Sequence, residues 1–171
     1  MKIITSLEEY FKIIKTLARP KAEIRIATYN LFAGVLPDGR YTNDWGKENW
    51  HSNVGELLDH LHELDVKVEI KIGKPLFGKC KLQDNVECCM HKKEEKWDDR
   101  LDQMDKRWPK FTFQILGISH AKLILFKLED GKHFSIYGGR NLSDAPLMDL
   151  SFVDADPKIY QKLLKVYETL Q

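Results

Sequence analysis

The chain has 171 residues, of which 43% are hydrophobic and 31% are charged, and its formal net charge is +1. This composition is typical of a soluble globular protein, and the length suits a single domain, which we expect to extend over residues 1–171. No apolar run approaches the roughly 20 residues of a membrane span, and the N-terminus becomes acidic too soon for a signal peptide, so we expect a cytoplasmic protein without membrane contact.

Two helix–strand units open the chain. Ser6 begins a capping-box pattern, and the apolar spacing after it predicts an amphipathic helix over residues 7–18. Residues 23–31 are rich in strand-forming side chains and are expected to form a buried strand. A second helix is expected to begin at Asn53, and the alternation of apolar and charged residues over 66–72 predicts a half-buried strand. Strands that alternate with helices favour parallel pairing.

The connection over residues 32–52 is rich in glycine and asparagine and is expected to be a loop. Three aromatic residues interrupt it: Tyr41, Trp45 and Trp50. Such side chains can stack on nucleic-acid bases. The alternative, which we favour, is that they fix the loop to the body of the protein.

A lysine-rich segment over residues 67–81 carries five lysines against one acidic residue. A segment of this kind is usually a solvated surface. It would follow the phosphates of a nucleic acid only if it lay beside the catalytic residues.

Four potential zinc ligands lie close together in the next part of the chain: Cys80, Cys88, Cys89 and His91. Thiolates and imidazoles are zinc ligands, and four of them suffice for a tetrahedral structural zinc site. The irregular spacing and the adjacent cysteines favour instead a loop with incidental thiols. No cofactor is expected for catalysis.

The second half of the chain is expected to hold a helix, several consecutive strands and a closing helix. A helix is expected over residues 93–107 and a strand over 111–116. Residues 150–153 are short enough for an edge strand, and Asp156 is the expected N-cap of a closing helix. The complete order predicts an α/β sandwich, with parallel pairing favoured by the alternation at the start of the chain.

The most informative stretch runs from His120 to Asn141. His120 and Lys122 stand two apart at the head of an apolar run, so on a strand they would share one face. Asp130-Gly131 marks a hairpin over residues 127–132, which would bring Asn141 back toward the histidine and the lysine. An imidazole, an ammonium group and an amide beside two glycines suit a tetrahedral phosphate.

This pattern, H-x-K followed by G-G-R-N, resembles the HKD motif of the phospholipase D superfamily. The resemblance implies an α/β sandwich, in which a mixed β-sheet is flanked by helices and carries the motif on adjacent central strands. It also implies that His120 attacks phosphorus and becomes phosphohistidine, while Lys122 and Asn141 hold the phosphoryl oxygens. The motif itself covers only a small part of the chain.

Two positions depart from the pattern of that family. Lys127 stands where a supporting acidic residue is usual, and Gly139 stands where a serine or threonine usually donates to the phosphate. The remaining roles are carried over from the same resemblance. Asp149 is the best match for the acid that orients the histidine, with Asp144 second. The residues expected to contact the substrate are Arg140, Gly138, Gly139 and Ser143.

The resemblance implies a second histidine that gives a proton to the leaving oxygen, and the chain holds one motif. His133 lacks a lysine at plus two and is a poor substitute. A homodimer with the site on its two-fold axis supplies the second histidine. We therefore predict a metal-independent nuclease that acts on nucleic acid, with DNA favoured over RNA, although the net charge of +1 gives no general attraction to phosphates.

Two alternatives remain open. The departures at Lys127 and Gly139 would suit a catalytically impaired module that only binds nucleic acid. A phosphodiesterase that acts on lipid or on another small phosphodiester would use the same residues.

Overall fold

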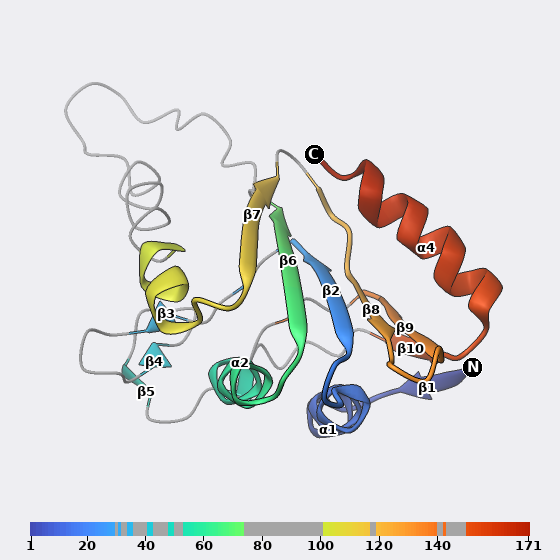
Figure 1. The fold of residues 1–171 in the computed structure, drawn as a ribbon, viewed down its shortest axis with the longest axis horizontal. Coiled ribbons are helices and arrows are strands. Elements are labelled where there is room, and N and C mark those ends of the chain that lie inside the picture. Colours follow the sequence, from blue (N-terminus) through green and yellow to red (C-terminus); the bar gives the residue numbers. More distant parts are fainter. Residues whose placement is uncertain are drawn as a thin grey trace.

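The computed structural model describes residues 1–29, 31, 34–35, 41–42, 48–49, 53–73, 101–116, 119–139, 142 and 150–171. Seven strands in these residues form one sheet in the order β1-β10-β9-β8-β2-β6-β7 (Figure 1). Their bounds are β1 Lys2–Ile4, β2 Glu23–Thr28, β6 Lys67–Gly73, β7 Thr112–Leu116, β8 Leu123–Lys127, β9 His133–Gly138 and β10 Ser151–Asp154. The predicted α/β class with a mixed sheet is confirmed.

The direction of the strands brings several of their ends to one edge of the sheet. β2, β6 and β7 are parallel, whereas β8 runs antiparallel to β2 and β9 antiparallel to β8. The C-terminal ends of β2, β6 and β9 therefore lie where β8 begins. We call this the carboxyl edge and define it by Thr28, Gly73, Leu116, Leu123 and Gly138.

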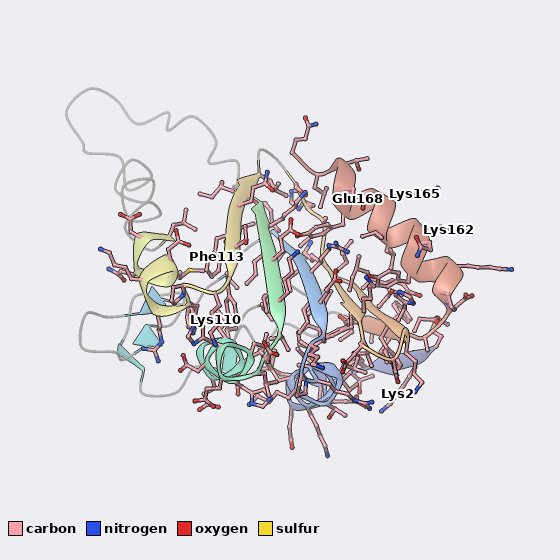
Figure 2. All side chains as sticks on the ribbon, viewed as in Figure 1. Lys2, Lys110, Phe113, Lys162, Lys165 and Glu168 are labelled. Atoms are coloured by element: carbon pink, nitrogen blue, oxygen red, sulfur yellow. The ribbon has the colours of Figure 1, made fainter. Side chains whose placement is uncertain are left out.

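Helices cover both faces of the sheet (Figure 1). One face packs against α1 (Leu7–Leu17) and α2 (Asn53–Glu63), whose buried leucines and isoleucines join those of β2 and β6 in the larger core cluster. The other face packs against α4 (Pro157–Thr169) through Tyr160 and Tyr167. Figure 2 shows Lys162, Lys165 and Glu168 on α4, where all three are exposed.

The sequence signals for the helix starts are confirmed. The Ser6 hydroxyl accepts from the backbone amide of Glu9 at 3.1 Å. The Asp156 carboxylate accepts from the amide of Lys158 at 2.8 Å, with Pro157 beginning the helix. Each cap satisfies an amide that has no partner within its helix.

The predicted hairpin between β8 and β9 is also confirmed. Lys127 pairs with His133, the amide of Leu128 donates to the carbonyl of Lys132 at 2.9 Å, and Gly131 has a φ of 80°. The pairing makes β8 and β9 neighbours near the middle of the sheet.

Two expectations about strands need correction. β10 is not an edge strand, because the N-terminal residues form β1 and pair with it on its outer side. The connection over 32–52 is not wholly a loop: β3 (Gly34–Val35), β4 (Tyr41–Thr42) and β5 (Glu48–Asn49) form a second, three-stranded sheet. Strands of two or three residues are too short to show a period in sequence.

The strand predicted over residues 23–31 is shorter than expected, and the helix predicted over 93–107 is described only in part. β2 ends at Thr28, although Leu31 makes an isolated bridge to Leu142. Residues 101–107 are helical, and the first part of the predicted helix, 93–100, lies outside the described residues. No helix in the described ranges combines the length and apolar character needed to cross a membrane.

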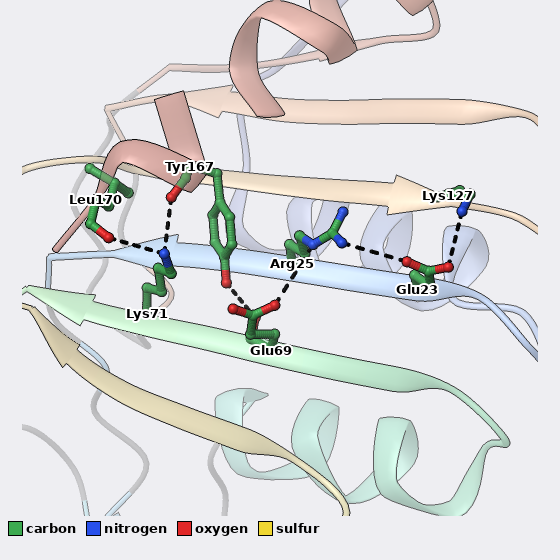
Figure 3. Close-up of polar contacts among 7 residues, drawn as sticks. All are labelled: Glu23, Arg25, Glu69, Lys71, Lys127, Tyr167 and Leu170. Atoms are coloured by element: carbon green, nitrogen blue, oxygen red, sulfur yellow. Dashed lines mark hydrogen bonds and ion pairs between the residues drawn. The ribbon is translucent and has the colours of Figure 1, made fainter. Parts of the chain in front are cut away.

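The prediction that β6 is half-buried is wrong at Lys71, which is only 7% exposed. Its ammonium group donates to the carbonyls of Tyr167 and Leu170 at 3.1 and 3.0 Å (Figure 3). Tyr167 lies in the last turn of α4 and Leu170 is its C-cap, whose amide also donates to the Tyr167 carbonyl at 3.3 Å. Lys71 therefore ties the end of α4 to the sheet and does not contribute to a solvated lysine surface. Lys67 is exposed, as expected.

A row of charged groups continues this contact across the same face (Figure 3). Arg25 lies 3.7 Å from both the Glu23 and the Glu69 carboxylates, and the Tyr167 hydroxyl donates to the carbonyl of Glu69 at 3.4 Å. Burial raises the pKa of Tyr167, so the phenol stays protonated and remains a donor.

Candidate active site

His120 and Lys122 lie at the carboxyl edge, just before β8. The prediction that they belong to the strand is wrong, because pairing with β2 ends at Ala27 and Leu123. His120 is exposed and Lys122 is half-buried. The imidazole is therefore accessible to a substrate at the point where several strands end.

The two side chains meet at one aromatic ring. Tyr29 follows the last residue of β2, and its ring stacks on the His120 imidazole, with centroids 4.2 Å apart and an interplanar angle of 13°. The Lys122 ammonium lies 5.9 Å from the centroid of the Tyr29 ring and donates to the carbonyl of His120 at 3.2 Å. The histidine and the lysine thus both lie at the Tyr29 ring, and they do not share one face of a strand.

The chain can take this course because β6 ends in a glycine. A methyl group on Gly73 would overlap the backbone carbonyl of Ser119 and lie 3.3 Å from Cα of Tyr29. Ser119 also accepts from the amide of Ala121 through its hydroxyl at 3.3 Å. The backbone segment that carries His120 therefore lies directly against the end of β6.

Gly138, which ends β9, and Gly139, which follows it, approach the next strand closely. Gly138 has a φ of 146°, and a Cβ there would lie 2.5 Å from the carbonyl oxygen of Leu150 and 2.8 Å from Cα of Ser151. The amide of Gly139 donates to the same Leu150 carbonyl at 3.0 Å. Gly138 is one residue beyond Tyr137, which pairs with Leu123, so it lies beside the segment of Lys122.

The chain after these glycines returns to the end of β2. The amide of Leu142 donates to the buried Thr28 hydroxyl at 3.0 Å, and Leu142 bridges Leu31 in parallel. Both halves of the motif are therefore anchored at the end of β2: one through Thr28, and the other through Tyr29.

Several predicted site residues lie outside the described residues. Among the catalytic and substrate-binding candidates these are Arg140, Asn141, Ser143, Asp144 and Asp149, and among the zinc candidates Cys80, Cys88, Cys89 and His91. In the described ranges, no three His, Cys, Asp or Glu side chains form a group that could hold a metal ion. The predicted roles of these residues stay predictions.

Lys127, at the position where the motif usually has an acid, lies at the opposite end of β8 from His120. Its ammonium group bonds the Glu23 carboxylate at 3.1 Å. This hydrogen bond lowers the pKa of Glu23 below its ordinary value. In this chain the position serves an ion pair between neighbouring strands.

His133 lies at the same distant end of the sheet. Its ring contacts Tyr160 of α4, with centroids 4.3 Å apart. Because β9 separates it from the carboxyl edge, it does not join His120 and Lys122.

Three residues of the site were not predicted from sequence: Thr28, Tyr29 and Gly73. Thr28 and Tyr29 fall within the buried strand predicted over residues 23–31, and Gly73 directly follows the strand predicted over 66–72. A usable signal was nevertheless present, since ligands of open α/β sheets collect at the carboxyl ends of strands. An aromatic residue and a glycine at two such ends were candidates on that ground.

The arrangement has a definite chemical capability. An accessible imidazole is a nucleophile when neutral, and an adjacent ammonium group attracts the oxygens of a phosphate. Backbone next to glycine allows close approach of a ligand, which a side chain would block.

Comparisons with protein-family models and with curated protein sequences find no match. Among solved structures, the chain is similar to a crystal structure of a mutant yeast tyrosyl-DNA phosphodiesterase, with a TM-score of 0.42 and 11% sequence identity over 98% of this chain. The chain spans 37% of the length of that protein. No activity follows for this chain from a similarity at this level.

Proposed function

We propose that the chain is a metal-independent phosphodiesterase of the phospholipase D type that cleaves DNA. One observation carries the proposal: an exposed histidine and a lysine, spaced as in the HKD motif, meet beside a glycine pair at the carboxyl edge. The proposal takes residues 1–171 as one unit of that kind. A histidine with a purely structural role, in an ion pair or in the core, would not need an accessible imidazole at this place.

The proposed reaction has two steps. A nitrogen of His120 attacks phosphorus, the nitrogen–phosphorus bond forms, and the bond from phosphorus to the leaving oxygen breaks. Water then attacks the phosphohistidine, loses a proton, and frees the histidine as the phosphate monoester leaves. Covalent catalysis of this kind divides one difficult displacement into two easier ones.

Charge on the phosphoryl oxygens must be stabilised in both steps. Lys122, whose ammonium group bonds the His120 carbonyl at 3.2 Å, is proposed to do this with the help of Asn141 and Arg140. Gly138, Gly139 and Ser143 are proposed to complete the contacts. Preorganised donors of this kind are usually the largest contribution to catalysis.

The leaving oxygen needs a proton, for which we propose His120 of the partner subunit. In a homodimer with its axis through the site, one histidine attacks while the other donates, and their roles reverse in the second step. Asp149, or Asp144 in its place, is proposed to orient the imidazole through the nitrogen that does not attack.

The test is cleavage of DNA in excess chelator by the wild type, His120→Ala and His133→Ala. The proposal predicts that His120→Ala lowers the rate by at least about 10³-fold, because the nucleophile is lost. His133→Ala is the matched control, since it removes a histidine that also contacts a tyrosine ring. Equal cleavage by His120→Ala and wild type would contradict the proposal.

A catalytically impaired binding module is the second candidate, and the ion pair of Lys127 with Glu23 favours it. The position that usually supports the catalytic lysine is committed here to another contact. This candidate predicts DNA binding that survives His120→Ala, with no turnover of DNA or of small phosphodiesters by the wild type. Turnover of a lipid headgroup but not of DNA would mean that the substrate is a lipid and that the proposed reaction at His120 still applies.

A further inference from the structure

We propose that Tyr29 is a positioning residue that holds the His120 imidazole in the orientation needed for attack, which deepens the proposed function and rests on it. The two rings are nearly parallel, with centroids 4.2 Å apart and an angle of 13° between their planes. The residue lies outside the HKD pattern and follows β2, whereas His120 precedes β8.

A stacked ring suits this task because of what it leaves free. Both imidazole nitrogens lie in the plane of the ring, so contact with the face restricts rotation without occupying either nitrogen. A hydrogen bond would orient the ring through one of the two atoms that the chemistry uses. The Tyr29 contact can therefore act together with an acid on the second nitrogen.

The position of Tyr29 is itself fixed from two sides. Thr28, its neighbour, is buried and accepts from the Leu142 amide, which ties the end of β2 to the chain after β9. Gly73 of β6 lies against Cα of Tyr29 and against the carbonyl of Ser119, one residue before His120. The absence of a side chain at Gly73 is thus the condition for the two rings to meet.

The same ring lies near the second candidate catalytic group. Lys122 places its ammonium 5.9 Å from the Tyr29 centroid, within the range of a cation–π attraction. Loss of the ring would release both side chains while leaving them in the protein. The expected consequence is a lower kcat with little change in KM, because the groups that contact the substrate remain present.

The first experiment compares Tyr29→Leu, Tyr29→Phe and the wild type by steady-state cleavage of DNA in chelator. Tyr29→Leu is expected to lower kcat by about 10–100-fold and to keep KM within about twofold, and Tyr29→Phe, which retains the ring, is expected to stay near wild type. Tyr137→Leu is the control: this half-buried tyrosine stacks on Phe152, at 5.8 Å between centroids. A similar loss in both Tyr29 variants would assign the role to the hydroxyl and overturn the proposal.

A second measurement reads the stack without turnover. Ring currents of Tyr29 shift the NMR signals of the His120 ring protons, and we expect the shift to persist in Tyr29→Phe and to disappear in Tyr29→Leu. Gly73→Ala, which alters the backbone under the rings, is expected to change both the shift and kcat. Wild-type kcat in Tyr29→Leu, or unchanged His120 signals, would overturn the proposal.

The two proposals fail in different ways. If wild-type protein cleaves no phosphodiester, or His120→Ala is as active as wild type, the proposed function fails and Tyr29 loses its catalytic role with it. If His120→Ala is inactive while Tyr29→Leu has wild-type kcat, only the positioning role fails. The NMR signals report in either case whether the rings are stacked.

Discussion

At the scale of single residues, the carboxyl edge depends on places where backbone approaches backbone. Gly138 combines a φ of 146° with close approach to Leu150 and Ser151. Such a residue has no room for a side chain and a conformation that other residues rarely adopt. The chain that carries the second half of the motif is therefore fixed by a glycine beside it.

We expect Gly138→Ala to lower the free energy of unfolding by about 2–4 kcal/mol, because it adds both steric overlap and backbone strain. Gly131→Ala is the matched control. Its φ is 80°, and no atom lies within 4 Å of an added Cβ, so strain alone should cost about 1–2 kcal/mol. Urea unfolding measures both values, and equal values would show that the contact with Leu150 is unimportant.

Lys71 provides a second prediction at this scale. Lys71→Met keeps the apolar stem but cannot donate to the carbonyls of Tyr167 and Leu170, so we expect a loss of about 1–3 kcal/mol in the free energy of unfolding. Lys67→Met, on the same strand and exposed, should change it by less than about 0.5 kcal/mol. Urea unfolding again decides, and an unchanged Lys71→Met would mean that water replaces the lysine.

The spacing of residues along the sequence predicts local relations, and it does not predict contacts between distant segments. His120 and Lys122 were predicted because their relation is local, two positions apart on one segment. Tyr29 and Gly73 were not predicted, because their contacts with His120 and Ser119 arise only once β2, β6 and β8 lie side by side. Lys71 was wrongly predicted to be solvated for a similar reason: the alternation along β6 does not show that α4 covers that face of the sheet.

At the scale of elements, capped helices and the long hairpin were predictable, and the shortest strands were not. Ser6 and Asp156 mark helix starts with local hydrogen bonds. β1 has three residues, and only its pairing with β10 makes it a strand. Its value to the fold is that it covers a strand that would otherwise be an open edge.

The contribution of β1 can be measured with neighbouring isoleucines. Ile4 is 2% exposed, so Ile4→Ala should lower the free energy of unfolding by about 2–4 kcal/mol through lost burial and a cavity. Ile3 is 49% exposed, and Ile3→Ala should change it by less than about 0.5 kcal/mol. Equal effects in thermal or urea unfolding would show that β1 does not pack as described.

The ion pair between β8 and β2 gives a prediction about pH. The pKa of Glu23 is lowered by the Lys127 hydrogen bond, so the pair stabilises the fold above the ordinary carboxyl pKa and loses this effect as the carboxylate is protonated in acid. Both side chains are partly exposed, which limits the contribution to less than about 1 kcal/mol.

We therefore expect Lys127→Met to be slightly less stable than wild type at pH 7, and the difference to be smaller at about pH 3, where more of the Glu23 carboxyl is protonated. Urea unfolding at the two pH values tests this expectation. The same variant should keep wild-type DNA cleavage, because the ion pair lies at the far end of β8. A loss of cleavage would instead connect Lys127 with catalysis.

At the scale of the whole molecule, one motif per chain leads to the proposal of a shared site. If both His120 side chains of a dimer serve one reaction, mixing wild type with inactive His120→Ala after subunit exchange should lower activity as the square of the wild-type fraction. Independent sites would give a linear decrease. Sedimentation of the active species provides the control, since an active monomer would contradict the shared site directly.

The central claim is that His120 forms a covalent bond to phosphorus, and trapping that intermediate tests it most directly. Wild-type protein is denatured during turnover of DNA in chelator, and its intact mass is measured. We predict an added mass equal to one DNA fragment joined through its phosphate to His120, an adduct that is lost on mild acid treatment and is not formed by His120→Ala. Cleavage by wild type without any adduct, or an adduct that survives in His120→Ala, would contradict the mechanism.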